Sequence, residues 1–177
     1  MTEEQQALSQ SSLIRADLNK RLSSATLQYS HTDIERALDQ LSVEVTVAFQ
    51  DQTPQCICVL PDGFMFAGML LRRLIFPLTI YTANQPPAQP VGEVLDLSRP
   101  ILLLGAEIGQ PSYMPWLDWL APGAVTCIAM LQAAEPQSCT TYAALPALAG
   151  EKVGCGFQLE GYAANWGGLY LLENDLS

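Results

Sequence analysis

The sequence predicts an α/β fold in which a central, mainly parallel sheet is flanked by helices. Apolar runs at 55–60 and 101–104 indicate short buried strands, because parallel strands covered on both faces are apolar along their length. Segments with helical spacing lie at 64–75 and around 113–120, after each of these runs. This alternation of strands and helices is typical of a parallel sheet with covering helices.

The N-terminal part of the chain predicts two helices. Residues 3–22 carry leucines at loose helical spacing, which indicates an amphipathic helix. Residues 29–50 have the strongest helical pattern in the chain, with one continuous apolar stripe. His31, the only histidine, lies at the start of this helix, so we expect a helix-flank role and not catalysis. We assign 1–28 to an N-terminal helical extension and 29–177 to the main domain.

The middle of the chain predicts a sharp turn and a proline-rich excursion. Pro61-Asp62-Gly63 follows the first strand, and we expect Asp62 to be the N-cap of the next helix. A strand is expected at 78–83. Residues 84–100 hold four prolines and one glycine, which favours an extended segment in which 92–98 pairs briefly as an edge hairpin.

The C-terminal part predicts one long strand and several short ones. The long strand is expected at 124–131, and small residues and turn formers follow at 132–150. Short closing strands are expected at 152–157, 161–163 and 168–172.

Composition limits the class of protein. A chain of 177 residues, with 49% hydrophobic and 15% charged residues, fits one packed domain. No segment approaches the ~20 apolar residues of a membrane span, and no secretory signal is visible, so we expect a cytoplasmic protein without a membrane partner. The net charge of −10 argues against a nucleic-acid partner, which requires a basic face.

The five cysteines indicate buried, reduced thiols. Cys56 and Cys58 alternate along a strand and therefore point to opposite faces, which opposes both a metal pair and a disulfide. With a single histidine, a His-based zinc site and a Ser–His triad are not expected. We expect no metal site and no cofactor.

Residues 101–113, ILLLGAEIGQPSY, form a strand whose loop runs directly into a helix. Ligands of open α/β sheets bind at loops of this kind. The layout resembles the phosphoribosyl-diphosphate loop of type I phosphoribosyltransferases, and of the hypoxanthine-guanine branch in particular. The likeness extends from about Tyr29 to Leu172. It implies a parallel sheet with flanking helices, an N-terminal helix and a small C-terminal hood.

The resemblance implies a ligand loop that has lost most of its acidic residues. The family's loop carries an acid pair, a third acid, a turn glycine and a threonine. In this chain the acid pair falls on Gly105 and Ala106 and the third acid on Gly109. The turn glycine falls on Pro111 and the threonine on Tyr113. Glu107 and Ser112 retain polar groups, and Gln110 lies between them. No confident catalytic residue follows, although Glu107 and Gly109 lie on the loop that carries the family's acids.

Further segments resemble other parts of the family's site. Asp62 and Gly63 stand at its diphosphate-contacting turn, although an ionised Asp62 would repel a diphosphate. Residues 153–166 resemble the closing segment that stacks on the base. There the residues expected at the substrate are Phe157, Tyr162, Asn165 and Trp166, with either Phe157 or Gln158 at the base-stacking position. The lysine with which the family recognises the base falls near Ala134. The arginine that would hold the diphosphate is absent. Residues 84–100 stand where the family has its mobile lid.

The resemblance implies a transferase scaffold with little or no transferase activity. One missing donor in such a site costs about 3–4 kcal/mol of transition-state stabilisation, and here three acids, a lysine and an arginine are missing together. We expect a binding, regulatory or interaction protein. Its expected ligand is a purine or nucleotide-like small molecule, and its expected partner is a second copy of the chain or a related active enzyme.

Two alternatives remain open. An active purine phosphoribosyltransferase of purine salvage would use phosphoribosyl diphosphate and Mg²⁺, with Glu107 at the ribose and Asp62 or Asp96 serving the metal. An interaction protein without a small ligand would have its cleft filled by Tyr113 or Trp166.

Four residues are candidates for an apolar surface or pocket: Pro115, Trp116, Trp119 and Trp166. Trp116 and Trp119 share one helix face, a spacing that is also typical of core packing.

Overall fold

The computed structural model describes residues 15–120, 125–133 and 139–173. Contacts divide the chain into two compact units, one formed by His31–Ala149 and one that combines Met1–Ser30 with Gly150–Ser177. Each unit contains its own sheet. The assignment of 1–28 to an N-terminal extension and of 29–177 to the main domain stays a prediction.

The larger unit is built on five parallel strands. They are β2 (Gln55–Val59), β3 (Thr79–Ala83), β4 (Ile101–Glu107), β5 (Val125–Leu131) and β6 (Thr140–Leu145). Their order in the sheet is β3-β2-β4-β5-β6, and each neighbouring pair is parallel. The predicted fold class is confirmed, and the apolar run at 101–104 lies in the centre of the sheet.

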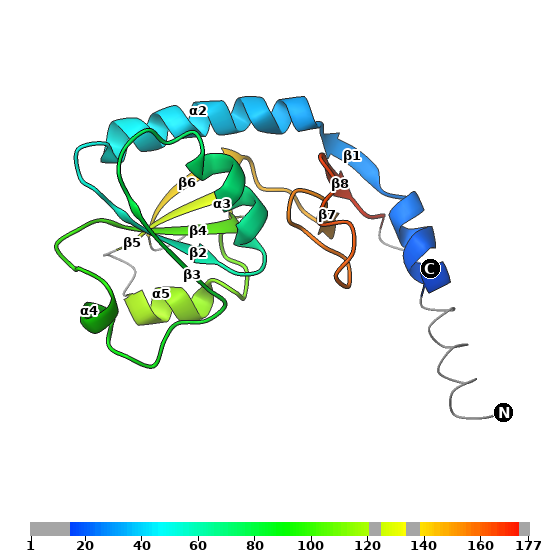
Figure 1. The fold of residues 1–177 in the computed structure, drawn as a ribbon. Helices are drawn as coiled ribbons and strands as arrows, with labels where there is room; N and C mark the ends of the chain where they lie inside the picture. Colours follow the sequence, from blue (N-terminus) through cyan, green and yellow to red (C-terminus); the bar gives the residue numbers. More distant parts are fainter. Residues whose placement is uncertain (1–14, 121–124, 134–138, 174–177) are drawn as a thin grey trace. The chain divides into compact units, whose positions relative to one another are not determined.

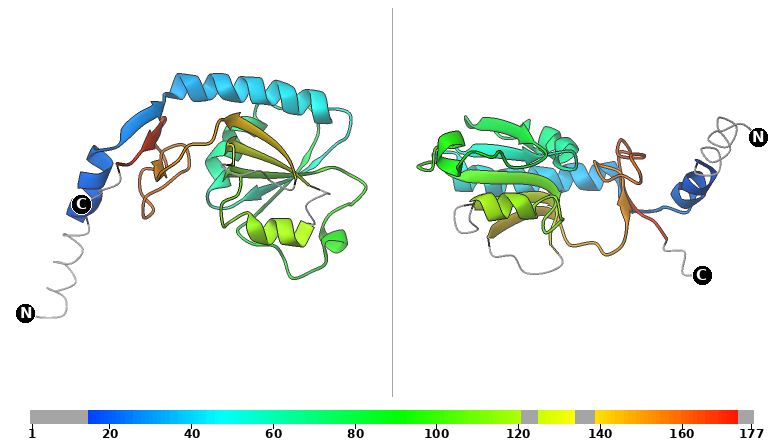
Figure 2. Two further views of the ribbon diagram at one scale, coloured as in Figure 1. Left: turned by 180° about the vertical axis from the view of Figure 1, so that it is seen from behind. Right: turned by 90° about the horizontal axis from the view of Figure 1, so that it is seen from below.

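Helices cover both faces of this sheet. They are α2 (His31–Phe49), α3 (Gly63–Leu71), α4 (Val91–Val94) and α5 (Met114–Leu120). Figure 1 shows α2 and α3 on one face and α4 and α5 on the other, and Figure 2 shows the same layers from behind. Every residue of β2 is buried, as expected for a strand that is covered on both sides. No helix in the described part of the chain is both long and apolar enough to cross a membrane.

The smaller unit contains a three-stranded antiparallel sheet. Its strands are β1 (Thr26–Tyr29), β7 (Lys152–Val153) and β8 (Leu169–Leu171), in the order β1-β8-β7. Residues 15–23 are helical, which confirms that part of the predicted helix at 3–22, whereas 3–14 lie outside the described residues. The core of this unit combines Leu18 of the helix with Val153, Leu159 and Leu172.

Some strand predictions were wrong. The strands β1 and β6 were not predicted, because the sequence of β6, TTYAAL, is half-buried and consists of small and hydroxyl side chains, while three of the four residues of β1 are exposed. Neither strand therefore carries the apolar signal of a buried strand. In place of the strand at 161–163 there is a turn closed by a single bridge between Leu159 and Tyr162.

The segment 84–100 is not an edge hairpin. Its only regular element is the short helix α4, and we call the whole range the cover segment. The side-chain amide of the buried Gln55 donates to the carbonyl of Asp96 at 2.8 Å and accepts from the backbone N–H of Asp96 at 3.0 Å. The indole N–H of Trp119 donates to the carbonyl of Gln89 at 3.0 Å. The cover segment is therefore tied to both β2 and α5.

An ion cluster joins α2 to the end of α3. Arg73 donates to Glu35 at 2.5 Å and to Asp39 at 2.7 Å, and only 12% of its side chain is exposed. The hydrogen bond from Arg73 is the main cause that lowers the pKa of Glu35 below its usual value. A carboxylate with a lowered pKa stabilises the fold at neutral pH and loses this contribution as the pH falls through that pKa.

We expect Arg73→Met to lower the free energy of unfolding by about 1 kcal/mol at neutral pH, because the ion pairs of Arg73 are lost. The difference from the wild type should shrink as the pH falls through the lowered pKa of Glu35, since this carboxylate is then protonated in both proteins. Urea unfolding at a series of pH values measures this. Arg36 is 68% exposed and lies 3.6 Å from Asp33, so Arg36→Met is a matched control with a small effect. A loss for Arg73→Met that does not depend on pH would contradict the assignment.

The thiols predict a second measurable property. All five cysteines are free; four are buried and Cys139 is half-buried. Burial raises the pKa of Cys56 to about 12 and that of Cys58 to about 11. Because the thiolate is the reactive form, iodoacetamide at pH 8 should label the native protein at Cys139 alone and all five cysteines after unfolding. Peptide mass spectrometry reads the labelled positions, and rapid native labelling of Cys56 would contradict the described packing.

Candidate functional site

The carboxyl ends of the central strands meet at one edge of the sheet. Glu107 at the end of β4 is in register with Leu131 at the end of β5. The turn at 60–62 follows β2 at the same edge, and the loop at 108–113 follows β4. Ligands of open α/β sheets bind at such an edge, so this is the candidate site.

The turn after β2 brings α3 against β4. Asp62 occupies the N-cap position of α3, as predicted, but its side chain makes no capping hydrogen bond. A Cβ atom at position 63 would lie 2.8 Å from the carbonyl oxygen of Leu104 and 2.9 Å from the Cα of Gly105. Only glycine fits at position 63, and it serves the close packing of α3 on β4.

The loop after β4 is compact. Gly109 has a φ of 89°, and the backbone N–H of Tyr113 donates to the carbonyl of Gln110 at 2.9 Å, which closes the turn before α5. The side-chain amide of Gln110 donates to Glu107 at 3.2 Å. The Ser112 hydroxyl oxygen is buried and has no hydrogen-bond partner among the described residues. The loop thus presents one carboxylate and two uncharged polar side chains.

Tyr113 belongs to the core. Its side chain is 1% exposed and packs among the residues between the sheet and α5. Its hydroxyl donates to the carbonyl of Ile128 at 3.4 Å, and burial raises its pKa well above the usual value. A Cβ atom at position 105 would overlap the Tyr113 ring. The tyrosine therefore fills the space into which a side chain at position 105 would project.

The predicted site residues are divided between the two units. Asp62, Gly63 and the residues of 105–113 meet at the carboxyl edge of the parallel sheet, with Ala106 and Tyr113 fully buried there. The other four lie in the smaller unit. Phe157 is buried, Tyr162 is half exposed, Asn165 is exposed, and the Trp166 ring packs edge-to-face on Tyr170 at 5.0 Å. A ligand site that joins the two sets stays a prediction.

The arginines of the larger unit are engaged elsewhere. Arg72 and Arg73 pair with acids of α2, as described above. Arg99, the basic residue closest in sequence to the loop, donates to the carbonyl of Thr53 at 2.7 Å and to the hydroxyl of Thr79 at 3.1 Å. These partners lie before β2 and at the start of β3, which is the opposite end of the sheet from the candidate site.

Comparisons of sequence find no matching family model and no matching curated protein. Comparisons of structure find clear matches. A hypoxanthine-guanine-xanthine phosphoribosyltransferase aligns with a TM-score of 0.70 and 21% identity, over 84% of this chain and 94% of its own. The Leishmania tarentolae hypoxanthine-guanine enzyme, solved with GMP, has a TM-score of 0.71 and 15% identity, over 85% and 98%. The Bacillus anthracis enzyme has a TM-score of 0.67 and 15% identity, over 84% and 97%.

The chain has a hypoxanthine-guanine phosphoribosyltransferase-like fold. The resemblance inferred from residues 101–113 is confirmed at the level of the fold. The low identities fit a chain whose site motifs differ from those of the enzymes that it resembles.

The phosphoribosyltransferase-like fold implies a Mg²⁺-bound diphosphate, and the donor set of this loop does not fit one. Mg²⁺ in proteins is held by carboxylates together with phosphate oxygens. Glu107 is the only carboxylate of the range 105–113 and is hydrogen-bonded by Gln110. Among the described residues, no three His, Cys, Asp or Glu side chains gather closely enough to hold a metal ion.

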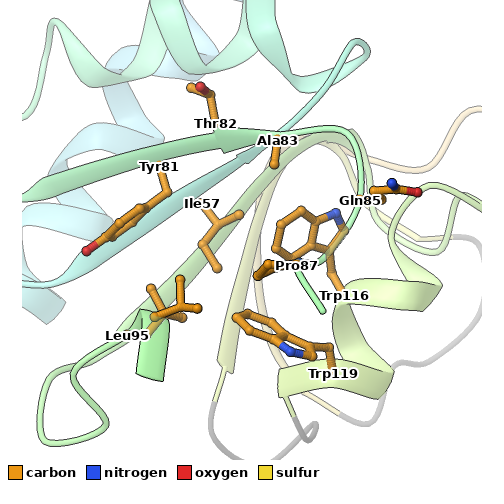
Figure 3. A pocket seen from close by; sticks show the side chains of 10 residues that line it. Ile57, Tyr81, Thr82, Ala83, Gln85, Pro87, Leu95, Trp116 and Trp119 are labelled. Atoms are coloured by element: carbon orange, nitrogen blue, oxygen red, sulfur yellow. The ribbon is translucent and has the colours of Figure 1, made fainter. Parts of the chain in front are cut away.

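The sequence analysis missed one group of residues. Trp116 and Trp119 line a cavity together with Tyr81, Gln85 and Pro87, on the α5 face of the phosphoribosyltransferase-like sheet. Of the four candidates for an apolar surface or pocket, Trp116 and Trp119 line this cavity (Figure 3), whereas Pro115 and Trp166 do not; Trp116 also belongs to the buried core, the role that its helical spacing favoured. The contribution of β3 and of the cover segment had no signal in the sequence, because their position over α5 depends on the tertiary fold.

The contact between Gly105 and Tyr113 gives a testable prediction. We expect Gly105→Ala to lower the free energy of unfolding by about 2 kcal/mol, because the new methyl group overlaps the ring. In a Tyr113→Leu background, which lacks the overlapping ring atoms, the same change should cost clearly less. Denaturant unfolding of the four proteins measures this coupling.

Gly68→Ala is the matched control for this prediction. A Cβ atom at position 68 meets nothing within 4 Å, and the residue lies within α3, so the change should leave stability equal or raise it by up to about 1 kcal/mol. An equal cost of Gly105→Ala in both backgrounds would show that the ring is not the obstacle.

Proposed function

We propose that this chain is a phosphoribosyltransferase-like protein with little or no transferase activity that acts through binding or regulatory interaction. The observation that carries the proposal is the packing of Tyr113 against Gly105, where the family's acid pair begins. A carboxylate cannot project from position 105 while the ring occupies that space. The ring of the buried Tyr113 therefore occupies the space that the side chain of the family's first acid would need.

Electrostatics support the same proposal. Transfer of a phosphoribosyl group requires stabilisation of the departing diphosphate, which proteins supply with cations, metal ions or aimed backbone amides. The chain has a net charge of −10, and Arg73 and Arg99 are used in structural contacts. Pro111, at the family's turn glycine, has no amide to donate. A highly charged diphosphate would be poorly held.

A binding role is supported by the polar groups that the loop retains. Glu107 and Gln110 are half-buried polar side chains of this loop, and both can hydrogen-bond a ligand. We propose a purine or nucleotide-like small molecule as the ligand class, since a structural neighbour was solved with GMP. The partner that we propose is a second copy of the chain or a related active enzyme, in the cytoplasm.

The second candidate is an active purine phosphoribosyltransferase with displaced ligand residues. The observation in its favour is Glu107, a half-buried carboxylate at the carboxyl end of β4 that is oriented by Gln110. In this alternative Glu107 holds the ribose hydroxyls, and Mg²⁺ with phosphoribosyl diphosphate is bound by acids outside the usual positions.

The deciding experiment is an assay of guanine and hypoxanthine turnover with phosphoribosyl diphosphate and Mg²⁺. The Leishmania tarentolae enzyme is the positive control. We expect kcat/KM to be at least about 1,000-fold below the control, which is the upper end of the loss that removal of a single transition-state donor produces. Comparable turnover that is lost in a Glu107→Gln variant would overturn the proposal and establish the second candidate.

Calorimetric titration with GMP separates a binding role from an interaction role. Heat of binding that is reduced by Gln110→Ala, in the absence of turnover, supports a nucleotide-binding protein. No heat from GMP, combined with a concentration-dependent mass in analytical ultracentrifugation, supports the interaction role.

A further inference from the structure

Two of the five free thiols are in contact with each other across neighbouring strands. The Sγ atoms of Cys127 and Cys139 are 3.2 Å apart, and the Cys139 thiol donates to the Cys127 sulfur. Cys127 belongs to β5, and Cys139 directly precedes β6, whose first residue Thr140 pairs with Thr126. The two sulfurs therefore meet where β5 and β6 begin to pair, at the opposite end of the strands from the candidate site.

The other three cysteines are placed differently. In the parallel register Cys127 is beside Leu103, which is beside Ile57 of β2, and all three belong to the core cluster between the sheet and α5. The two cysteines that flank Ile57 along β2 therefore point to the other face of the sheet. Cys155 lies in the smaller unit. Among the described residues, Cys127 and Cys139 are thus the pair of thiols placed to react with each other.

The two thiols of this pair differ in their access to solvent. Cys139 is half-buried, whereas Cys127 is 0% exposed. Burial raises the pKa of Cys127 well above its usual value, so this thiol stays protonated at neutral pH. A small oxidant from solvent reaches Cys139 first, and the product formed there lies against the Cys127 thiol. An accessible cysteine beside a second thiol that resolves its oxidation product is one arrangement by which proteins respond to oxidants.

We propose that Cys127 and Cys139 form an oxidation site that hydrogen peroxide converts reversibly into a disulfide. The Cys139 sulfur attacks one peroxide oxygen and the O–O bond breaks, which leaves a sulfenic acid on Cys139 and releases one water molecule. The Cys127 sulfur then attacks the Cys139 sulfur and the S–O bond breaks. The departing hydroxyl takes the proton of the Cys127 thiol and leaves as a second water molecule. Two thiols are oxidised, and one hydrogen peroxide is reduced to two waters.

The bond requires little movement of the chain. A disulfide is ~2.05 Å long, so the two sulfurs have to approach by about 1 Å from their present contact. Cys139 precedes the first residue of β6, and β6 lies at the edge of the sheet next to β5. An adjustment at this position leaves the pairing of the central strands unchanged. The disulfide would fix the start of the edge strand against β5, and a dithiol would release it again by exchange. This site goes beyond the proposed function and involves none of the transferase positions.

The test treats the reduced, full-length protein with hydrogen peroxide. The remaining thiols are then blocked with N-ethylmaleimide in denaturant, and the protein is digested without a reductant. Chymotrypsin cleaves after Leu131 and Tyr142, which separates Cys127 and Cys139 into different peptides. We expect mass spectrometry to find these two peptides joined by a disulfide, and dithiothreitol to separate them.

Three cysteine variants identify the roles of the two thiols. In Cys127→Ala the sulfenic acid at Cys139 has no thiol to resolve it, so dimedone, which traps sulfenic acids, should label Cys139 more strongly than in the wild type. In Cys139→Ala no disulfide should form, and the buried Cys127 should stay unmodified. Cys58→Ala is the matched control, since Cys58 is buried on the other face of the sheet, and it should give as much disulfide as the wild type.

Thermal unfolding shows whether the bond belongs to the native fold. The disulfide joins residues 12 positions apart, so oxidation should raise the melting temperature of the wild type by about 5 to 10 °C and leave that of Cys139→Ala unchanged. Four results would overturn the proposal: no disulfide after peroxide, a disulfide to another cysteine, a lower melting temperature on oxidation, or equal dimedone labelling of the wild type and Cys127→Ala. A transferase assay that overturned the proposed function would leave these outcomes unchanged.

Discussion

The backbone of β4 at Gly105 is approached closely from both faces of the sheet. On one face, Gly63 at the start of α3 packs against the Leu104 carbonyl and the Gly105 Cα; on the other, the ring of Tyr113 occupies the space of an absent side chain. The position of α3, the closure of the loop at 108–113 and the start of α5 all depend on this contact. It also explains why the central strand carries no side chain at this position of the candidate site.

This packing constrains how the chain can change. An acid at position 105 would meet the Tyr113 ring, and a smaller residue at 113 would leave a void in a core that includes Leu103 and Trp116. Either substitution alone is therefore costly, and an acid at position 105 requires a smaller side chain at position 113 as well.

Much of the fold was predictable from the sequence, and less of the site. The apolar runs of β2 and β4 and the stripe of α2 were visible because burial on two faces leaves a strong pattern. The end of β4 was placed at 104 instead of Glu107, because Gly105 and Ala106 lack the side chains on which such patterns rest. The cavity beside Trp116 and Trp119 could not be predicted in full, since β3, the cover segment and α5 are brought together only by the tertiary fold.

The cover segment stands where the resemblance placed a mobile lid, and its hydrogen bonds join it to Gln55 of β2 and to Trp119 of α5. A lid that closes around its ligand loses conformational entropy at that moment, and the loss weakens binding. The hydrogen bonds of the cover segment restrict its conformations within the folded chain, so closing over a ligand would cost this segment less entropy than a free loop would lose.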